Sequence, residues 1–224
     1  MSPKTRNITL MSILVFFICS SLSIWQIKRL KWKEDLINNI TEAYNSDSIN
    51  INKLTGDLSN FNFKKVYIEG FFINNKSMFL GPRVHKERVG YNLITPFLLK
   101  DERYILINRG WIKEKKIIQD VKNKYEIEGI LKEGNIKNFF TPKNSIKNNL
   151  WFYINTYQMS EFSGLKLSDN IFLDLIRSKP NDNITIINSS MPKIVNNHLQ
   201  YALTWAILAV LFLVMNYIYY RKYR

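Results

Sequence analysis

The sequence predicts a membrane protein in which two transmembrane α-helices flank a mainly β (α+β) soluble domain, an antiparallel barrel or sandwich. Two observations predict the helices: residues 8–24 and 201–220 are uncharged and apolar, and each run approaches the roughly 20 residues that cross a hydrocarbon core of about 30 Å. The third observation predicts the domain. Between these segments lie short runs rich in aromatic and β-branched residues, separated by Gly and Pro, which is typical of short strands.

The first apolar run, preceded by Lys4 and Arg6, reads as an uncleaved anchor. A signal peptide would end at small residues of the A-x-A type, but here the chain continues directly into a basic and aromatic stretch. Apolar residues recur at helical spacing over residues 25–44, so the helix is expected to continue beyond the membrane, with a basic face toward lipid headgroups. Residues 45–62 are polar and predict a loop.

The central region predicts the β domain. The expected strands are the alternating residues 66–72 and the apolar runs 91–99, 104–107, 125–131 and 151–154. Four dipeptides are interpreted as breaks between strands: Gly81-Pro82, Thr95-Pro96, Arg109-Gly110 and Thr141-Pro142. His85 lies in a charged run that we interpret as an exposed loop.

One short helix is expected inside this domain, from Thr156 to Ser163. Asn155 can cap its start, the Gln158 side chain can reach back to the cap, and Gly164 ends it. Residues 171–176 then read as a strand with Ile171, Leu173 and Leu175 on one side. Asp174 falls on the other side, where a basic partner such as Arg83 or Arg109 is expected.

The second span has aromatic residues near both ends and a basic segment after it, as inserted helices do. The predicted segments are a tail and first transmembrane helix (1–24), a juxtamembrane amphipathic helix and loop (25–62), a β-rich extracytoplasmic domain (63–195), a second transmembrane helix (196–220) and a basic cytoplasmic tail (221–224). The basic residues on the two sides of the spans balance, so charge alone does not orient the chain.

Composition excludes several function classes. The net charge of +14 is spread along the chain without a nucleic-acid-binding signature, so we expect a membrane-surface role and no nucleic acid. The only cysteine, Cys19, lies in an apolar run and excludes an internal disulfide and a CxxC metal motif. No catalytic sequence signature is present. We expect no enzyme; a carboxylate, Ser or Tyr centre without a signature is the alternative.

His198 is the main candidate site residue, because it has a side chain that can bind a metal and it directly precedes the second span. Two interpretations are open: an axial ligand for a haem iron, with Tyr201 and Trp205 as packing neighbours one and two helical turns on, or an interfacial His bonded to Asn197 or a headgroup. Arg83 and Arg109, beside turn residues, are candidates for clamping a carboxylate such as a haem propionate. Their alternative is a structural ion pair with Asp174, Glu69 or Glu128.

Several blocks together resemble the surfeit locus protein family, membrane-anchored assembly factors of haem-copper cytochrome c oxidase. They occur in family order over almost the whole chain and are specific only in combination. The blocks are Trp25-Gln26 with Arg29 and Lys33, Glu69-Gly70, residues 80–83, Gly90 with Thr95-Pro96, residues 106–111, Glu128-Gly129, residues 140–142 with Asn144, Trp151-Phe152, residues 172–174, and residues 196–205. Ser23 departs from the family pattern, since Gly usually stands there.

The resemblance implies a multi-pass protein of the cell inner membrane, with both termini cytoplasmic and the central domain periplasmic. It implies a role in cytochrome c oxidase assembly, aiding haem a delivery or insertion into the catalytic subunit. Haem a binding would be transient, and His198 would bind only the haem iron. The partners would be the oxidase catalytic subunit or its assembly intermediates, together with membrane lipids. The alternative is a membrane-anchored interaction module that stabilises an assembly intermediate without binding haem.

Overall fold

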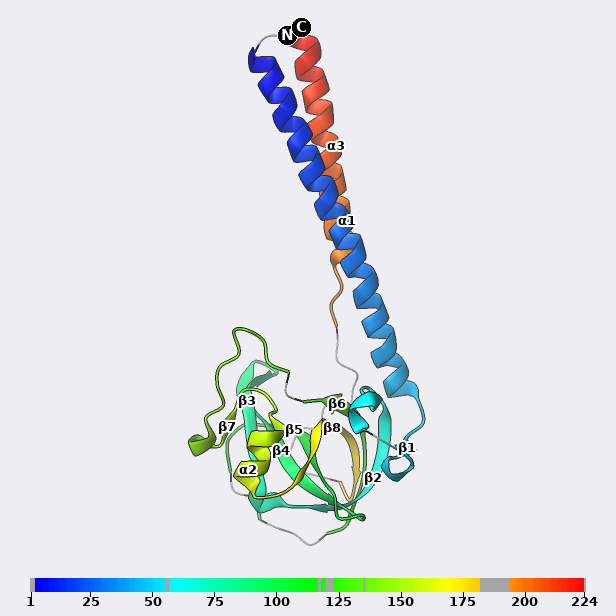
Figure 1. The fold of residues 1–224 in the computed structure, drawn as a ribbon, viewed down its shortest axis with the longest axis vertical. Helices are drawn as coiled ribbons and strands as arrows, with labels where there is room; N and C mark the ends of the chain where they lie inside the picture. Colours follow the sequence, from blue (N-terminus) through cyan, green and yellow to red (C-terminus); the bar gives the residue numbers. More distant parts are fainter. Residues whose placement is uncertain are drawn as a thin grey trace. The chain divides into compact units, whose positions relative to one another are not determined.

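The computed structural model describes residues 3–54, 57–116, 118–119, 123–134, 136–181 and 194–223 (Figure 1). The chain divides into two compact units, one made of Met1–Asn39 with Pro192–Arg224 and the other of Ile40–Met191. Residues 182–193, which the sequence assigns to the end of the β-rich domain, lie outside the described part of the chain. Each unit is described by itself below.

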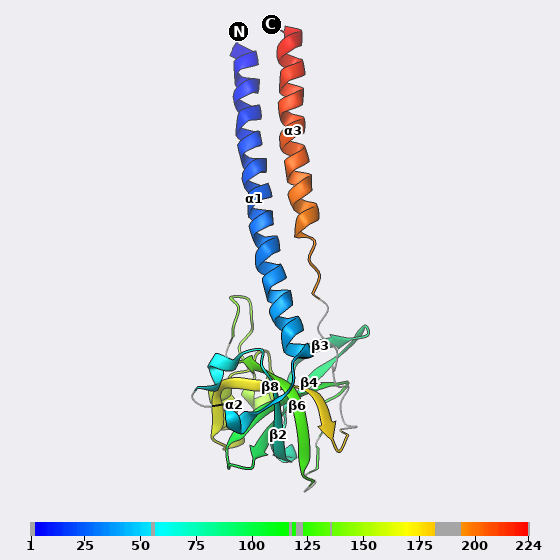
Figure 2. The same ribbon diagram turned by 90° about the vertical axis from the view of Figure 1, so that its right-hand side faces the viewer.

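The first unit consists of two long helices, α1 (Pro3–Asn45, its last turns belonging to the second unit) and α3 (His198–Tyr223). Figures 1 and 2 show the two helices side by side, with the start of α1 beside the end of α3. Both are long and apolar enough to cross a membrane, and large apolar side chains such as Phe17 and Ile207 are more than half exposed on them. The two predicted helices and the unbroken continuation of α1 through residues 25–44 are confirmed.

The second unit is built on one mixed sheet (Figure 2). Its described strands are β1 (Ile49–Asn50), β2 (Lys65–Phe72), β3 (Met78–His85), β4 (Arg88–Leu99), β5 (Tyr104–Ile112), β6 (Tyr125–Glu133), β7 (Leu150–Trp151) and β8 (Leu167–Lys179). The strand order is β1-β2-β6-β8-β5-β4-β3-β7. The described connections contain short 3₁₀ helices at Ile51–Lys53, Leu58–Phe61, Asn74–Lys76 and Ile146–Asn148.

Strand β2 bends the sheet into a partial ring. Its residues from Lys65 to Gly70 pair with β6, and its last residues, from Gly70 to Phe72, pair with β4. Gly70 belongs to both pairings, and a Cβ added there would lie 1.9 Å from the backbone oxygen of Leu98. The absence of a side chain at this position therefore allows the two strands to meet.

The fold class is confirmed as two long apolar helices flanking a mainly β domain, with two refinements. The sheet is mixed, because β1–β2, β3–β7 and β5–β8 are parallel pairs, and the ring is partial, not a true barrel. The strand β8 reaches β5 only after the chain has passed through β6, β7 and the helix α2 (Thr156–Ser163). A connection of that length allows the returning strand to pair either parallel or antiparallel. The spacing of strands along the sequence therefore did not predict the parallel pairing of β5 with β8.

The interior of the ring is filled by alternating side chains. Ile171, Leu173 and Leu175 of β8 are buried on one side, as predicted, and pack in a cluster with Val66, Ile68, Phe97 and Ile127. A second cluster surrounds the fully buried Trp151 and includes Met159 of α2. These two clusters fix the strands that carry the candidate site residues of the domain.

The short helix α2 has the predicted bounds and caps. The Asn155 Oδ1 accepts from the backbone N–H of Gln158 at 2.9 Å, and Gly164 ends the helix with φ 70°. The predicted return of the Gln158 side chain to the cap is wrong, because its Oε1 accepts from the Nδ2 of Asn144 at 3.0 Å. That bond ties the helix to the segment that precedes β7.

Three of the four dipeptides interpreted as breaks lie inside strands. Gly81-Pro82 lies in β3, Thr95-Pro96 in β4 and Arg109-Gly110 in β5. Register shifts lie at Gly81-Pro82 and at Arg109-Gly110, and they let β3 and β5 continue past these residues. Thr95 and Pro96 keep the regular register opposite Ile107 and Leu106. The predicted loop 45–62 likewise contains β1 and two 3₁₀ helices, whose Ile51 and Leu58 are buried in the ring core.

Candidate functional site

His198, the first residue of α3, contacts the side chain of Gln26 on α1. The His198 Nδ1 lies 2.6 Å from the Gln26 Oε1. An amide oxygen can only accept a hydrogen bond, so this contact places the ring proton on Nδ1. In a neutral ring with this proton position, Nε2 has the lone pair that a metal ligand needs, and the contact with Gln26 fixes the orientation of the ring.

Close packing of small residues supports this contact one turn away. The Ser23 hydroxyl donates to the backbone oxygen of Ala202 at 3.0 Å, and both residues are buried. Cys19, one turn further along α1, is also buried, as expected for a small apolar residue. Small side chains let helices approach closely where lipid surrounds them. The short Ser23 side chain allows this close approach, and its hydroxyl has an acceptor.

Trp205 and Tyr201 differ in their position around α3. Trp205, two turns after His198, is half-buried on the same face as His198 and Ala202. Tyr201 is 54% exposed and lies on the flank of that face. The exposed Leu199 lies on the same turn as His198. Leu199 and Tyr201 lie on opposite sides of His198 around the helix, and exposed apolar side chains beside a held imidazole are suited to a flat apolar group such as a tetrapyrrole.

Arg109 is a structural residue of the ring core. It is 0% exposed, its Nη1 donates to the Oδ1 of Asn74 at 2.6 Å, and its guanidinium lies 4.1 Å from the centre of the Phe72 ring. A side chain buried in this way does not face an external ligand. The structure thus favours the structural interpretation, although the Nη1 of Arg109 donates to the Asn74 amide oxygen and not to one of the three predicted carboxylates.

Those carboxylates are held by other groups. Asp174 accepts from the Asn108 Nδ2 at 2.7 Å and pairs with Lys132, so the expected basic partner is present, but it is neither Arg83 nor Arg109. Glu128 pairs with Arg177 at 2.9 Å. The reason is the register: Asn108 lies opposite Asp174 across β5 and β8, and Glu128 lies opposite Arg177 across β6 and β8.

Glu69 also has its own partners. Its carboxylate contacts Lys100 at 2.7 Å and Lys124 at 2.6 Å, and it accepts from the Tyr67 hydroxyl at 3.0 Å. The two lysine hydrogen bonds are the main reason that the pKa of Glu69 falls to about 2. Loss of hydration and the bond to Glu69 raise the pKa of Tyr67 to about 12. The Glu69 carboxylate is therefore ionised at physiological pH and pairs with two lysines.

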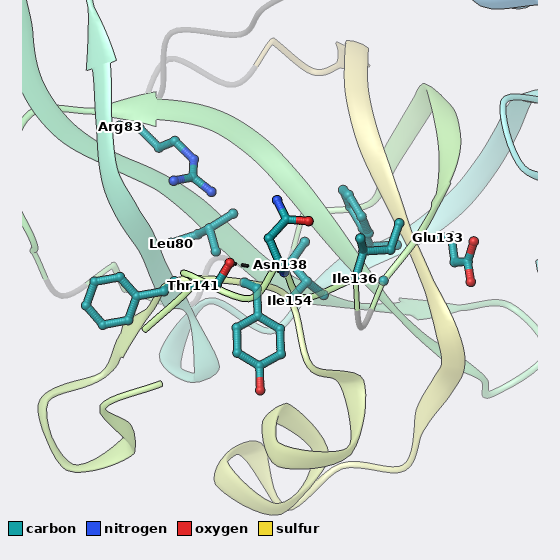
Figure 3. Close-up of a pocket in the computed structure, with 11 residues that line it drawn as sticks. Leu80, Arg83, Glu133, Ile136, Asn138, Thr141 and Ile154 are labelled. Atoms are coloured by element: carbon teal, nitrogen blue, oxygen red, sulfur yellow. Dashed lines mark hydrogen bonds between the residues drawn. The ribbon is translucent and has the colours of Figure 1, made fainter. Parts of the chain in front are cut away.

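Arg83 differs from Arg109, because it is half-exposed and lines a cavity of about 400 Å³ (Figure 3). Leu80 and Ile154 contribute apolar walls, and Asn138 and Thr141 contribute polar groups. His85, two residues on, is also half-buried and stacks on Trp111 with ring centres 5.4 Å apart, so the interpretation as an exposed loop residue is wrong. Of the two predicted arginines, only Arg83 faces a space that a ligand can enter.

Comparison with known proteins identifies the family. The family model described as the SURF1 family matches residues 13–210. The chain belongs to the SURF1 family. A SURF1-like protein of Rickettsia conorii is 34% identical over 220 residues, covering 94% of this chain and 90% of that protein. Surfeit locus protein 1 of Gallus gallus is 28% identical over 233 residues, covering 94% of this chain and 74% of that protein.

Two pairs of the sequence blocks that resemble the SURF1 family contact each other in the structure. Gln26 and His198, from the first and last blocks, form the helix contact, while Asn108 and Asp174 form the cross-strand bond. Gln26 was not among the predicted site residues. Its place in the Trp25-Gln26 block was a signal, but its pairing with His198 depends on how α1 and α3 pack.

Proposed function

We propose that this SURF1-family chain is an assembly factor for haem-copper cytochrome c oxidase that aids delivery of haem a to the catalytic subunit. The family supports the assembly role. The single observation that supports haem binding is the 2.6 Å contact between the His198 Nδ1 and the Gln26 Oε1, which leaves the Nε2 available to iron. The partners would be the oxidase catalytic subunit or its assembly intermediates.

The residues around His198 fit a haem at one axial position. The His198 Nε2 would bind the iron, Gln26 would keep the ring proton on Nδ1, and Tyr201 and Trp205 would contact the apolar macrocycle. When bound, haem a supplies the metal centre that the oxidase requires. A single imidazole ligand beside exposed apolar side chains suits transient binding, because few contacts must be broken on release. No catalytic turnover is part of this role.

The interaction-module alternative differs in its dependence on His198. If the domain only stabilises an oxidase intermediate, changes on the β domain would impair oxidase maturation while His198→Ala would be tolerated. In the haem-delivery role, His198→Ala impairs maturation although the domain stays folded. Oxidase activity in cells that carry each variant as their only copy separates the two functions.

The proposed location is the inner membrane, with both termini cytoplasmic and the β domain periplasmic. A phosphatase reporter that is active only in the periplasm should be silent when fused after Arg224 and active when inserted at Asp47 in the segment after α1. Activity at Arg224 together with silence at Asp47 would reverse the proposed topology.

We expect Gln26→Leu to weaken haem a binding about 10- to 100-fold, the usual effect of removing a group that orients a metal-ligating His. The measurement is haem titration of the detergent-purified chain, followed by the visible spectrum. Asn38→Leu is the control, since it also replaces a side-chain amide with Leu, at an exposed position of α1. Equal haem affinity in wild type and Gln26→Leu would remove Gln26 from the site.

A further inference from the structure

The cavity beside Arg83 has a cation at one end and an acidic group at the other. Figure 3 shows the Arg83 guanidinium and the Asn138 amide on facing sides, above Leu80, with Glu133 at the far end. The remaining walls include Phe152, Ile154 and Phe172. A volume of about 400 Å³ lies within the range of roughly 300–1,000 Å³ for ligand sites. The cavity can hold a short apolar group with a charged end.

Arg83 has no acidic partner among the described residues. Its side chain bonds there only to the neighbouring Pro82 oxygen, at 3.0 Å from Nη1. Partial burial lowers the pKa of Arg83, and no carboxylate of the described residues offsets this loss of hydration. A guanidinium has five N–H donors arranged in a planar fork, so a carboxylate can still bind to Arg83 through two parallel bonds.

The opposite wall is a tight turn from Asn138 to Thr141. The Thr141 N–H donates to the Asn138 oxygen at 3.0 Å, and the Asn138 N–H donates to the Thr141 Oγ1 at 3.2 Å. Both end residues line the cavity, while the tip presents Phe139 and Phe140, which are 94% and 90% exposed. Their rings contact each other edge to face, 5.2 Å apart. One turn therefore joins a polar cavity wall to an exposed aromatic pair.

We propose that this surface docks a polypeptide partner through an extended segment in which a carboxylate lies beside apolar side chains. Arg83 and the Asn138 amide receive the carboxylate, the apolar walls receive the neighbouring side chain, and Phe139 with Phe140 packs on the segment outside the cavity. Aromatic residues are enriched in protein–protein interfaces, where anchoring side chains fill pockets. The excess positive charge of the chain, +14, favours an acidic segment.

The identity of the partner as an oxidase subunit rests on the proposed function, but the chemistry of the cavity does not. The site uses no residue of the haem site. His198→Ala should therefore leave peptide binding unchanged, and loss of haem binding would not affect this inference.

The test uses the full chain in nanodiscs and the peptide acetyl-Leu-Phe-Leu, with either a free carboxyl terminus or a C-terminal amide. Calorimetry should give at least about tenfold tighter binding for the free acid. Arg83→Gln should abolish this difference, and Arg83→Lys should restore part of it. Glu133→Gln, at the other end of the cavity, is the matched control and should keep or increase the affinity. Phe139→Ser with Phe140→Ser should weaken both peptides equally.

Equal binding of acid and amide, or an unchanged preference in an Arg83→Gln chain that retains its thermal midpoint, would overturn the carboxylate site. Displacement of the peptide by protoporphyrin IX, but not by its dimethyl ester, would assign the cavity to a haem propionate instead. Full affinity in the double Phe variant would remove the aromatic pair from the interface.

Discussion

Gly70→Ala is expected to destabilise the β domain by about 3 kcal/mol or more, because overpacking against backbone cannot relax by a side-chain rotation. The added Cβ would lie 1.9 Å from the Leu98 oxygen and 2.8 Å from the Phe97 ring. The strands β2 and β4 would have to separate where they close the partial ring. Thermal or denaturant unfolding of the purified chain, followed by circular dichroism, measures the loss.

Gly134→Ala is the matched control for this substitution. Its added Cβ would meet its nearest neighbour, a methyl group of Ile154, at 3.4 Å, which is ordinary contact. We expect a change within about 1 kcal/mol. Similar unfolding midpoints for the two variants would contradict the close approach of β2 and β4 at Gly70.

Arg109→Ala is expected to cost about 3 kcal/mol or more, since it removes a large buried side chain and its hydrogen bond together. The substitution leaves a cavity beside Phe72 and removes the donor that contacts the Asn74 Oδ1 at 2.6 Å. Asn74 is itself 3% exposed, so water cannot readily replace that donor. Unfolding of the purified chain measures this effect.

Arg83→Ala is the control for Arg109→Ala. Arg83 is half-exposed and its guanidinium bonds only to the Pro82 oxygen among the described residues, so we expect a change within about 1 kcal/mol. A large decrease in the free energy of unfolding with Arg83→Ala, together with a small decrease with Arg109→Ala, would contradict the roles that the structure gives the two residues. The pair therefore separates a core arginine from a ligand-facing one.

Features set by neighbouring residues were predictable from the sequence. Uncharged length identified both apolar helices, and a capping Asn with a terminal Gly gave both ends of α2. Alternation placed Ile171, Leu173 and Leu175 on the buried face of β8. Each of these features depends on residues that are a few positions apart, so it can be predicted from the sequence alone.

Features set by distant residues were not predictable. The contact of Gln26 with His198 depends on the packing of α1 against α3, and the partners of Asp174 depend on the register of β8 between β5 and β6. Gly81-Pro82 reads locally as a break, yet neighbouring strands keep it within β3. The same limitation made Arg83 and Arg109 look alike, although one lines a cavity and the other lies in the core.

Haem binding at His198 is the central claim, and one measurement tests it most directly. The chain is purified in detergent from cells that make haem a, with His198→Ala and Asn38→Leu prepared alongside, and the visible spectra are compared. We predict stoichiometric haem a in the wild type and in Asn38→Leu, and its loss or an altered spectrum in His198→Ala. The absence of haem a from all three proteins, or an unchanged spectrum in His198→Ala, would contradict the account and favour the interaction module.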